Sequence, residues 1–448
     1  MRDCAAKTPS VLKRCMWGVG KALVVFFATA ALLLTALLGV ALIPRAAIAH
    51  HLLESAEYLC QDEMFFQVVD GVAGSKIDRY ADAILLGIAW QYDAQDPLRS
   101  VMASSYYHEP TGHENSGLRE TVANNLPANQ EYSRYWHGSI ALVRPLLTLL
   151  PIQGIYWLNA AVMLLLAGAL LVRLWRRRAW VPLVGSMVAL VGTSFWFVPL
   201  SLEYTWTPLV MLVQLHVVLS KRSLRSMEGR ALFFLLSGMV TSYLDFLTTE
   251  LLTLLVPLAL MLWQDQDEGK EPPTVGRTAI MAASWFCGYA GMWALKWILA
   301  QFVLGSDFQG TVGQHISMRS GSLRASTKSE QLCEALVRNV SCLFPLEYGT
   351  GATMAAVAVV VCVVVFAVTH RRRRMRARMI ACYGIIGLIP FVRFLVLNNH
   401  AFIHYFFTYR VLAATLFVVV LMLGELTDEE LFHVPSLGTN RSRGSSGT

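Results

Sequence analysis

Near its end the chain reads NNHAFIHYFFTYR, which places two histidines and an arginine among aromatic side chains. His400 and His404 are spaced i, i+4. If the preceding helix continues past Asn398, Arg393 shares one helical face with them at i, i+7 and i+11. Arg and His donors in such a stripe suit phosphate oxygens, and Arg makes forked contacts with them. The alternative is that these side chains only reach lipid headgroups.

Further ionisable residues lie at the ends of apolar runs or, as Lys296 does, within one, where charge is costly and commonly marks a functional site. They are Asp78, Asp82, Arg144, Glu203, Asp245, Glu250, Lys296 and Arg410. A carboxylate such as Asp82 could act as a general base, or it could lie on the solvated face of an amphipathic helix. Glu250 follows two threonines at an expected helix start, where the helix dipole favours an acid without any catalytic duty.

Metal and soluble-enzyme motifs are weak. The segment HEPTGHE has the wrong spacing for a zinc helix, and Pro110 would break that helix. His400 and His404 lack an acid three residues on. We therefore predict no metal site and no certain cofactor, and the sequence leaves a divalent-cation requirement open.

The surrounding sequence is that of a membrane protein. Of 448 residues, 55% are hydrophobic and only 15% charged, and the apolar residues form blocks of about 20 residues, long enough to cross a bilayer. The first block, 22–44, is interpreted as an uncleaved span because it is too long for a signal peptide and shows no cleavage site. We attribute the net charge of +7 to Lys and Arg on the cytoplasmic side, where they contact anionic lipid headgroups. We therefore predict a lipid bilayer as partner and no nucleic acid.

Clusters of Lys and Arg fix the expected orientation, because they collect on the cytoplasmic side. They require a tight helical hairpin that turns near YLDFLTTE. The prediction is an all-α polytopic cell-membrane protein with about ten transmembrane helices and both termini in the cytoplasm. The expected spans are 22–44, 155–172, 181–199, 206–220, 231–245, 250–264, 278–303, 351–369, 380–397 and 410–424.

Residues 1–424 are expected to form one transmembrane domain, followed by a disordered cytoplasmic tail at 425–448. Loops 45–154 and 304–350 are too long for simple connectors and are placed outside. Amphipathic helices are expected at SKIDRYADAILLGIAWQYD on the membrane interface, at YWHGSIALVRPLLTLL with a break at Arg144-Pro145, and at KSEQLCEALVRNVSCLF. Cys333 and Cys342 could form a disulfide there.

This plan of one span, a long outer loop with acidic amphipathic helices and many further spans resembles the GT-C superfamily of membrane glycosyltransferases. The segments IDRYADAILL, YWHGSIALVRPLL, YLDFLT and HAFIHYFFTYR also look like uncharacterised bacterial multi-pass proteins of this type. The resemblance is architectural over most of the chain and is carried by motifs only at these four places. The chain departs from the family pattern in that the acids nearest to span one are Glu54, Glu57, Asp62 and Glu63.

The resemblance implies transfer of a sugar from a polyprenyl-phosphate donor to an envelope acceptor on the outer face. A carboxylate of the first outer loop, Asp82 or Asp78, would act as general base. The phosphate of the lipid-linked donor would be bound by Arg393, His400, His404, Arg410 and Arg144. The acceptor or sugar would be bound by Asp245, Glu203 and Glu250.

Two other functions remain open. A transporter or flippase of a lipid-linked or anionic envelope precursor would explain Lys296 and Arg393 inside spans, although the sequence shows no inverted repeat and no paired Gly/Pro interruptions. A structural or sensing membrane protein would need no reaction. The oligomeric state, sugar and acceptor are not predicted.

Overall fold

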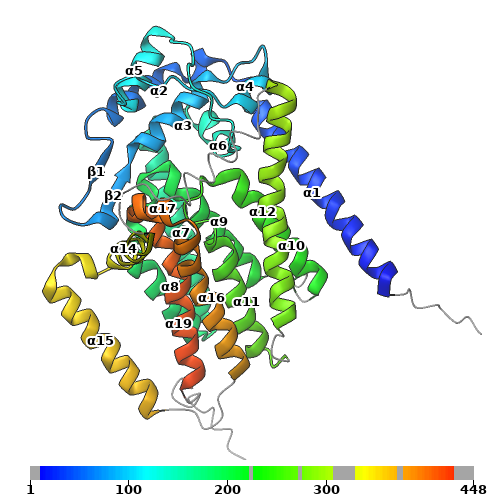
Figure 1. Ribbon diagram of the computed structural model, residues 1–448, viewed down its shortest axis with the longest axis vertical. Coiled ribbons are helices and arrows are strands. Elements are labelled where there is room, and N and C mark those ends of the chain that lie inside the picture. The colour runs from blue at the N-terminus through cyan, green and yellow to red at the C-terminus, as the bar shows by residue number, and fades with distance from the viewer. Residues whose placement is uncertain are drawn as a thin grey trace, which may run out of the picture.

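The computed structural model describes residues 11–220, 224, 226–270, 275–305, 328–370 and 377–427. Their fold is all-α apart from a short antiparallel pair of strands, β1 (Phe65–Gln67) and β2 (Lys76–Asp78). A layer of short helices lies across one end of a bundle of long helices (Figure 1). The predicted tail beyond residue 427 and the centre of the second long loop lie outside the described residues.

A helix corresponds to every predicted span. The ten helices are α1 (Val11–Ala41), α7 (Ile152–Arg176), α8 (Trp180–Gly192), α9 (Leu202–Val218), α10 (Met227–Leu244), α11 (Leu252–Asp267), α12 (Val275–Leu304), α15 (Thr350–Thr369), α16 (Ala377–Val396) and α19 (Ala413–Leu426). In Figure 1, α1 and α15 lie at opposite edges of the bundle.

Within the described residues, four stretches are long and apolar enough to cross a bilayer: Gly18–Ala41, Ile152–Arg176, Ala377–Val396 and Tyr405–Leu426. Their apolar side chains are largely exposed on α1 and α7, as expected for surfaces that contact lipid. The chain is therefore a multi-pass membrane protein. The full count of ten crossings and their direction stay predictions.

The first long loop folds as residues 45–151, here called the α2–α6 layer. It contains the strand pair and α2 (Arg45–Leu59), η1 (Ala73–Ser75), α3 (Arg79–Gln91), α4 (Pro97–Ala103), α5 (Glu114–Asn124) and α6 (Ile140–Leu146). The helix predicted around IDRYADAILL exists as α3, but its residues 82–90 are all buried. The prediction of an amphipathic helix at the membrane interface was wrong, because α3 has no solvated face over these residues and packs against α2, α5, α6 and α9.

The structure also describes three smaller features that were expected from the sequence. The helix predicted in KSEQLCEALVRNVSCLF is confirmed as α14 (Lys328–Ser341). The break predicted at Arg144-Pro145 lies one residue further on, since α6 includes Pro145 and ends at Leu146. Cys333 is exposed, Cys342 is buried, and both are free thiols.

The helices α10 and α12 pack with their backbones almost in contact. A Cβ atom on Gly238 would lie 2.0 Å from the Trp285 carbonyl oxygen, and one on Gly288 would lie 2.1 Å from that of Leu235. Glycines at a helix crossing let two backbones approach this closely in a membrane. This close packing of α10 and α12 places Lys296 of α12 within reach of the α2–α6 layer. The Lys296 ammonium donates to the carbonyls of Val101 and Met102 at 2.9 and 3.0 Å.

The C-terminal polar segment is not a continuation of the preceding helix. The helix α16 ends at Val396, Leu397 leaves the helical region at φ −105° and ψ 45°, and α17 (Asn398–Ile403) starts anew. It is followed by α18 (Tyr405–Thr408) and η5 (Tyr409–Leu412). The predicted stripe of Arg393, His400 and His404 required one helix that continues past Asn398, and the break at Leu397 removes that condition.

Candidate functional site

A cavity of about 200 Å³ lies where the α2–α6 layer meets the bundle. Its walls come from β2 and α3, from the loop at 132–137, from the start of α9, from the turn between α10 and α11, and from α17 and α18. The polar and aromatic residues that line it are Asp78, Tyr80, Asp82, Tyr132, Arg134, His137, Glu203, Phe246, His400, His404 and Phe407. Segments far apart in the sequence thus place acids, imidazoles and one guanidinium around one space.

Asp78 occupies the last position of β2 and caps α3. Its carboxylate accepts a hydrogen bond from the Ala81 N–H at 2.8 Å, which is the usual role of an Asp before a helix. The Glu203 carboxyl also hydrogen-bonds to it, so one of these two acids carries a proton. Burial raises the pKa of Asp78 to about 7, and the neighbouring Asp82 charge contributes to that rise.

Asp82 lies one turn further along α3 and is fully buried. It accepts hydrogen bonds from the Leu202 N–H at 2.9 Å, the Ser201 hydroxyl at 3.2 Å and the Tyr156 hydroxyl. Because α9 has no cap from its own Ser201 side chain, Asp82 serves as its N-terminal cap from another part of the chain. Burial still raises its pKa, to about 6. Both oxygens are already engaged, so Asp82 is better suited to positioning than to accepting a substrate proton.

His400 and His404 lie on consecutive turns, and their ring centroids are 4.8 Å apart. The ring of Phe407 lies 5.2 Å from that of His404 and forms the adjoining wall. The i, i+4 spacing seen in the sequence therefore brings both imidazoles to the cavity, even though α17 is a separate helix.

Arg134 and His137 complete the polar lining, and neither was among the predicted site residues. The Arg134 guanidinium lies 4.2 Å from the centre of the Tyr132 ring and donates to that residue's hydroxyl at 2.9 Å. His137 is buried, with its pKa lowered to about 3 by burial and by the Lys296 charge, so its ring is neutral. His137 belongs to the segment YWHGSI that was singled out in the sequence, and Arg134 directly precedes that segment, but nothing in the pattern distinguished either residue from an interfacial belt.

Arg393 does not line the cavity. Its Nε donates to Glu250 Oε1 at 2.6 Å, and its Nη2 donates to Glu250 Oε2 at 2.9 Å and to the Leu247 carbonyl at 2.8 Å. This forked, buried pair fastens α16 to the turn between α10 and α11. Asp245 in the same turn accepts hydrogen bonds from the Thr248 hydroxyl at 2.6 Å and the Thr207 hydroxyl at 3.0 Å.

The other two predicted arginines also bind main chain. Arg410 donates to the Gly74 carbonyl at 2.9 Å and ties η5 to the α2–α6 layer. Arg144 is fully buried and donates to the carbonyls of Ile43, Tyr92 and Ala89, the first at 2.6 Å. Each guanidinium satisfies carbonyl groups that a helix end would otherwise leave unpaired.

Five predicted site residues thus surround one cavity: Asp78, Asp82, Glu203, His400 and His404. Five others lie outside it and join helices to one another: Arg144, Asp245, Glu250, Arg393 and Arg410. No protein-family model matches the chain, and no curated protein and no solved structure matches it. The site must therefore be interpreted from its own chemistry.

Proposed function

We propose that this protein is a membrane glycosyltransferase that moves a sugar from a polyprenyl-phosphate donor to a hydroxyl acceptor on the outer face of the membrane. The observation that carries the proposal is the cavity at the junction of layer and bundle. Its carboxyl groups and aromatic rings suit a sugar, since acids accept from hydroxyls and rings stack on the apolar face of a pyranose. Arg134, His400 and His404 supply N–H donors for a phosphate.

The reaction needs one base that accepts the proton of the acceptor hydroxyl, and a group of hydrogen-bond donors that stabilise the departing phosphate. The acceptor hydroxyl gives its proton to Asp78, its oxygen forms a bond to the anomeric carbon, and the bond from that carbon to the phosphate oxygen breaks. The departing polyprenyl phosphate keeps the bonding electrons, and Arg134 with the two imidazoles stabilises its charge. A positioned base contributes about 10²–10⁴-fold. A pKa near 7 suits Asp78 to that role, because the carboxylate is then both populated and basic at neutral pH.

The proposed orientation places the α2–α6 layer outside the cell. This orientation is supported by basic residues at the opposite end of the bundle. Arg173 and Arg176 lie in the last turn of α7, and Arg230 lies near the start of α10. A donor with its tail in the bilayer can then present its headgroup to a cavity at the interface, while the acceptor arrives from water. Ten crossings with cytoplasmic termini, in a GT-C-like arrangement, form part of this proposal.

The alternative of a transporter receives less support. It rested on Lys296 and Arg393 as charges within spans, and both have static partners: two carbonyls for Lys296, and Glu250 with the hairpin carbonyls for Arg393. A transported ion would need groups that exchange partners. Neither residue lines the cavity.

The test is a reconstituted assay with purified full-length protein in proteoliposomes. Radiolabelled polyprenyl-phosphate hexoses and pentoses serve as donors and an envelope extract as acceptor, and both sugar transfer and released polyprenyl phosphate are measured. We expect Asp78→Asn to lower transfer at least about 100-fold, and Arg134→Gln and His404→Gln to lower it as well.

Asp70→Asn is the matched control, because Asp70 is an exposed acid between the same two strands. It should leave transfer unchanged. Equal transfer by wild type and all three cavity variants would refute the proposal. Movement of label across the bilayer without release of polyprenyl phosphate would establish the transporter instead, and the absence of both would favour a structural role.

A further inference from the structure

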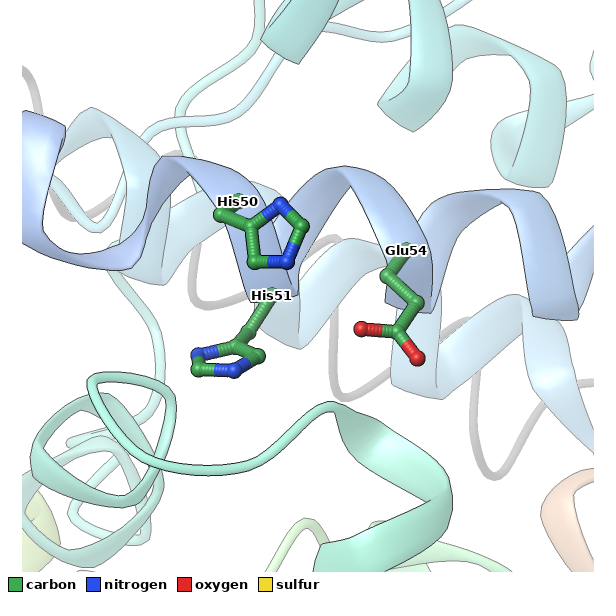
Figure 2. Close-up of side chains that lie close together, drawn as sticks. All are labelled: His50, His51 and Glu54. Atoms are coloured by element: carbon green, nitrogen blue, oxygen red, sulfur yellow. The ribbon is translucent and has the colours of Figure 1, made fainter.

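A group of possible metal ligands lies on α2, away from the cavity. His50, His51 and Glu54 each offer one ligand atom, and these three atoms lie within 4.8 Å of one another. Figure 2 shows the three side chains clustered on this helix. We propose that they form a Zn²⁺ site with two imidazole nitrogens and one carboxylate oxygen as ligands.

The hydrogen bond of His51 prepares its ring for a metal. Its Nδ1 lies 3.0 Å from the Leu147 carbonyl oxygen, which can only accept, so Nδ1 carries the proton. The lone pair is then on Nε2, the atom left to bind an ion. A metal-binding histidine typically donates its other ring N–H to a carbonyl or carboxylate in this way.

The helix is also fixed where the ligands lie. The Ser55 hydroxyl donates to the His51 carbonyl at 2.5 Å and accepts from the Ile152 N–H at 2.8 Å, so α2 is joined to the first residue of α7. His50 and Glu54 are one helical turn apart and their side chains are exposed. In tetrahedral coordination two ligands about 2.1 Å from the ion lie about 3.4 Å apart, so ligand atoms within 4.8 Å of one another have to approach by up to about 1.4 Å.

The ligand set selects among metals. Imidazole nitrogens with one carboxylate suit Zn²⁺, whereas Mg²⁺ and Ca²⁺ require oxygen ligands. Three protein ligands leave a fourth position for water. Because His51 contacts the turn between α6 and α7, the bound ion would strengthen the attachment of α2 to that turn. The inference is independent of the proposed reaction, since none of the three residues lines the cavity.

The experiment measures metal binding by full-length protein in detergent, with any affinity tag removed and the sample treated with a chelator. Zn²⁺ is titrated calorimetrically, and Co²⁺ is used as a coloured probe of tetrahedral coordination. We expect one Zn²⁺ per chain and a higher Tm with Zn²⁺. Loss of a supporting hydrogen bond alone weakens metal sites about 10–100-fold, so His50→Ala and Glu54→Gln should weaken binding at least as much.

His51→Asn separates ligation from folding, because its amide can still donate to the Leu147 carbonyl but offers no Nε2. It should fold like wild type, lose the Zn²⁺-dependent rise in Tm and bind at least about tenfold more weakly. His108→Ala is the control, since it removes another histidine that contacts a carboxylate, Glu114, on the same layer. Equal Zn²⁺ affinity in wild type and His51→Asn, or no stoichiometric binding by wild type, would overturn the proposal.

Discussion

Replacing Asp78 by Asn should stabilise the protein at alkaline pH while it removes the proposed base. The amide oxygen of the introduced side chain can still accept from the Ala81 N–H, so the cap on α3 is kept, and the amide NH₂ can donate to Glu203. What disappears is a carboxyl group that becomes ionised in a buried position beside two other acids. The substitution therefore tests whether the cavity holds this charge at a cost in stability.

The magnitude follows from the pKa of Asp78, which burial raises from 3.8 to about 7. One pKa unit corresponds to about 1.4 kcal/mol, so the ionised group lowers the free energy of unfolding by at most about 4 kcal/mol. The folded state holds the proton more tightly than the unfolded state. Well below pH 3.8 both states are protonated and the cost is zero. Stability then falls as pH rises from about 4 to about 7 and stays reduced above that.

Thermal unfolding of detergent-solubilised protein at pH 4.5 and pH 8 measures the effect. Wild type should lose stability between the two values, and Asp78→Asn should lose less. At pH 8 the variant should exceed wild type by about 1–3 kcal/mol, less than the upper limit because cavity water and the proton shared with Glu203 reduce the cost. Asp70→Asn should behave like wild type. If Asp78→Asn is destabilised equally at both pH values, the residue is only a helix cap and the reasoning fails.

Three further substitutions test the contacts that build the site, each by thermal unfolding. Gly288→Ala should cost at least about 2 kcal/mol, because the new methyl group meets backbone that cannot rotate away; a neutral result would show that α10 and α12 are further apart than described. Glu250→Gln should cost about 3–5 kcal/mol by leaving Arg393 buried without its carboxylate, and adding Arg393→Met should restore part of the loss. Asp82→Ala should cost about 2–4 kcal/mol by uncapping α9; a cost below about 0.5 kcal/mol would contradict the capping role.

Charge and hydropathy were sufficient to predict the ten helices that correspond to the expected spans, but not α4, α5 or the strand pair of the α2–α6 layer. Even the short hairpin between α10 and α11 was expected, because only a turn there keeps all the basic clusters on one side. Interactions between distant segments were not predictable in this way. The sequence pattern of α3 indicates one apolar face. In the folded protein the polar side chain of Asp82 on α3 is buried as well, against the first residue of α9.

For the site, too, the location of residues along the chain was predictable, whereas their contacts with distant segments were not. Acids of the α2–α6 layer and histidines near the C-terminus do line one cavity, as expected from placing both at the same end of the spans. None of the three predicted arginines lines the cavity: a sequence cannot reveal that Arg393 faces Glu250 across 143 positions or that Arg144 faces carbonyl groups. Arg134 was missed because its role depends on the path of an irregular loop.

The long-range cap on α9 also joins two segments that are synthesised at different times. Asp82 is made 120 residues before Leu202, the residue from whose N–H it accepts a hydrogen bond. The first turn of α9 is therefore capped only once the Asp82 carboxylate is in position to accept that hydrogen bond. The α2–α6 layer thus supplies a group that a helix made much later needs to complete its first turn.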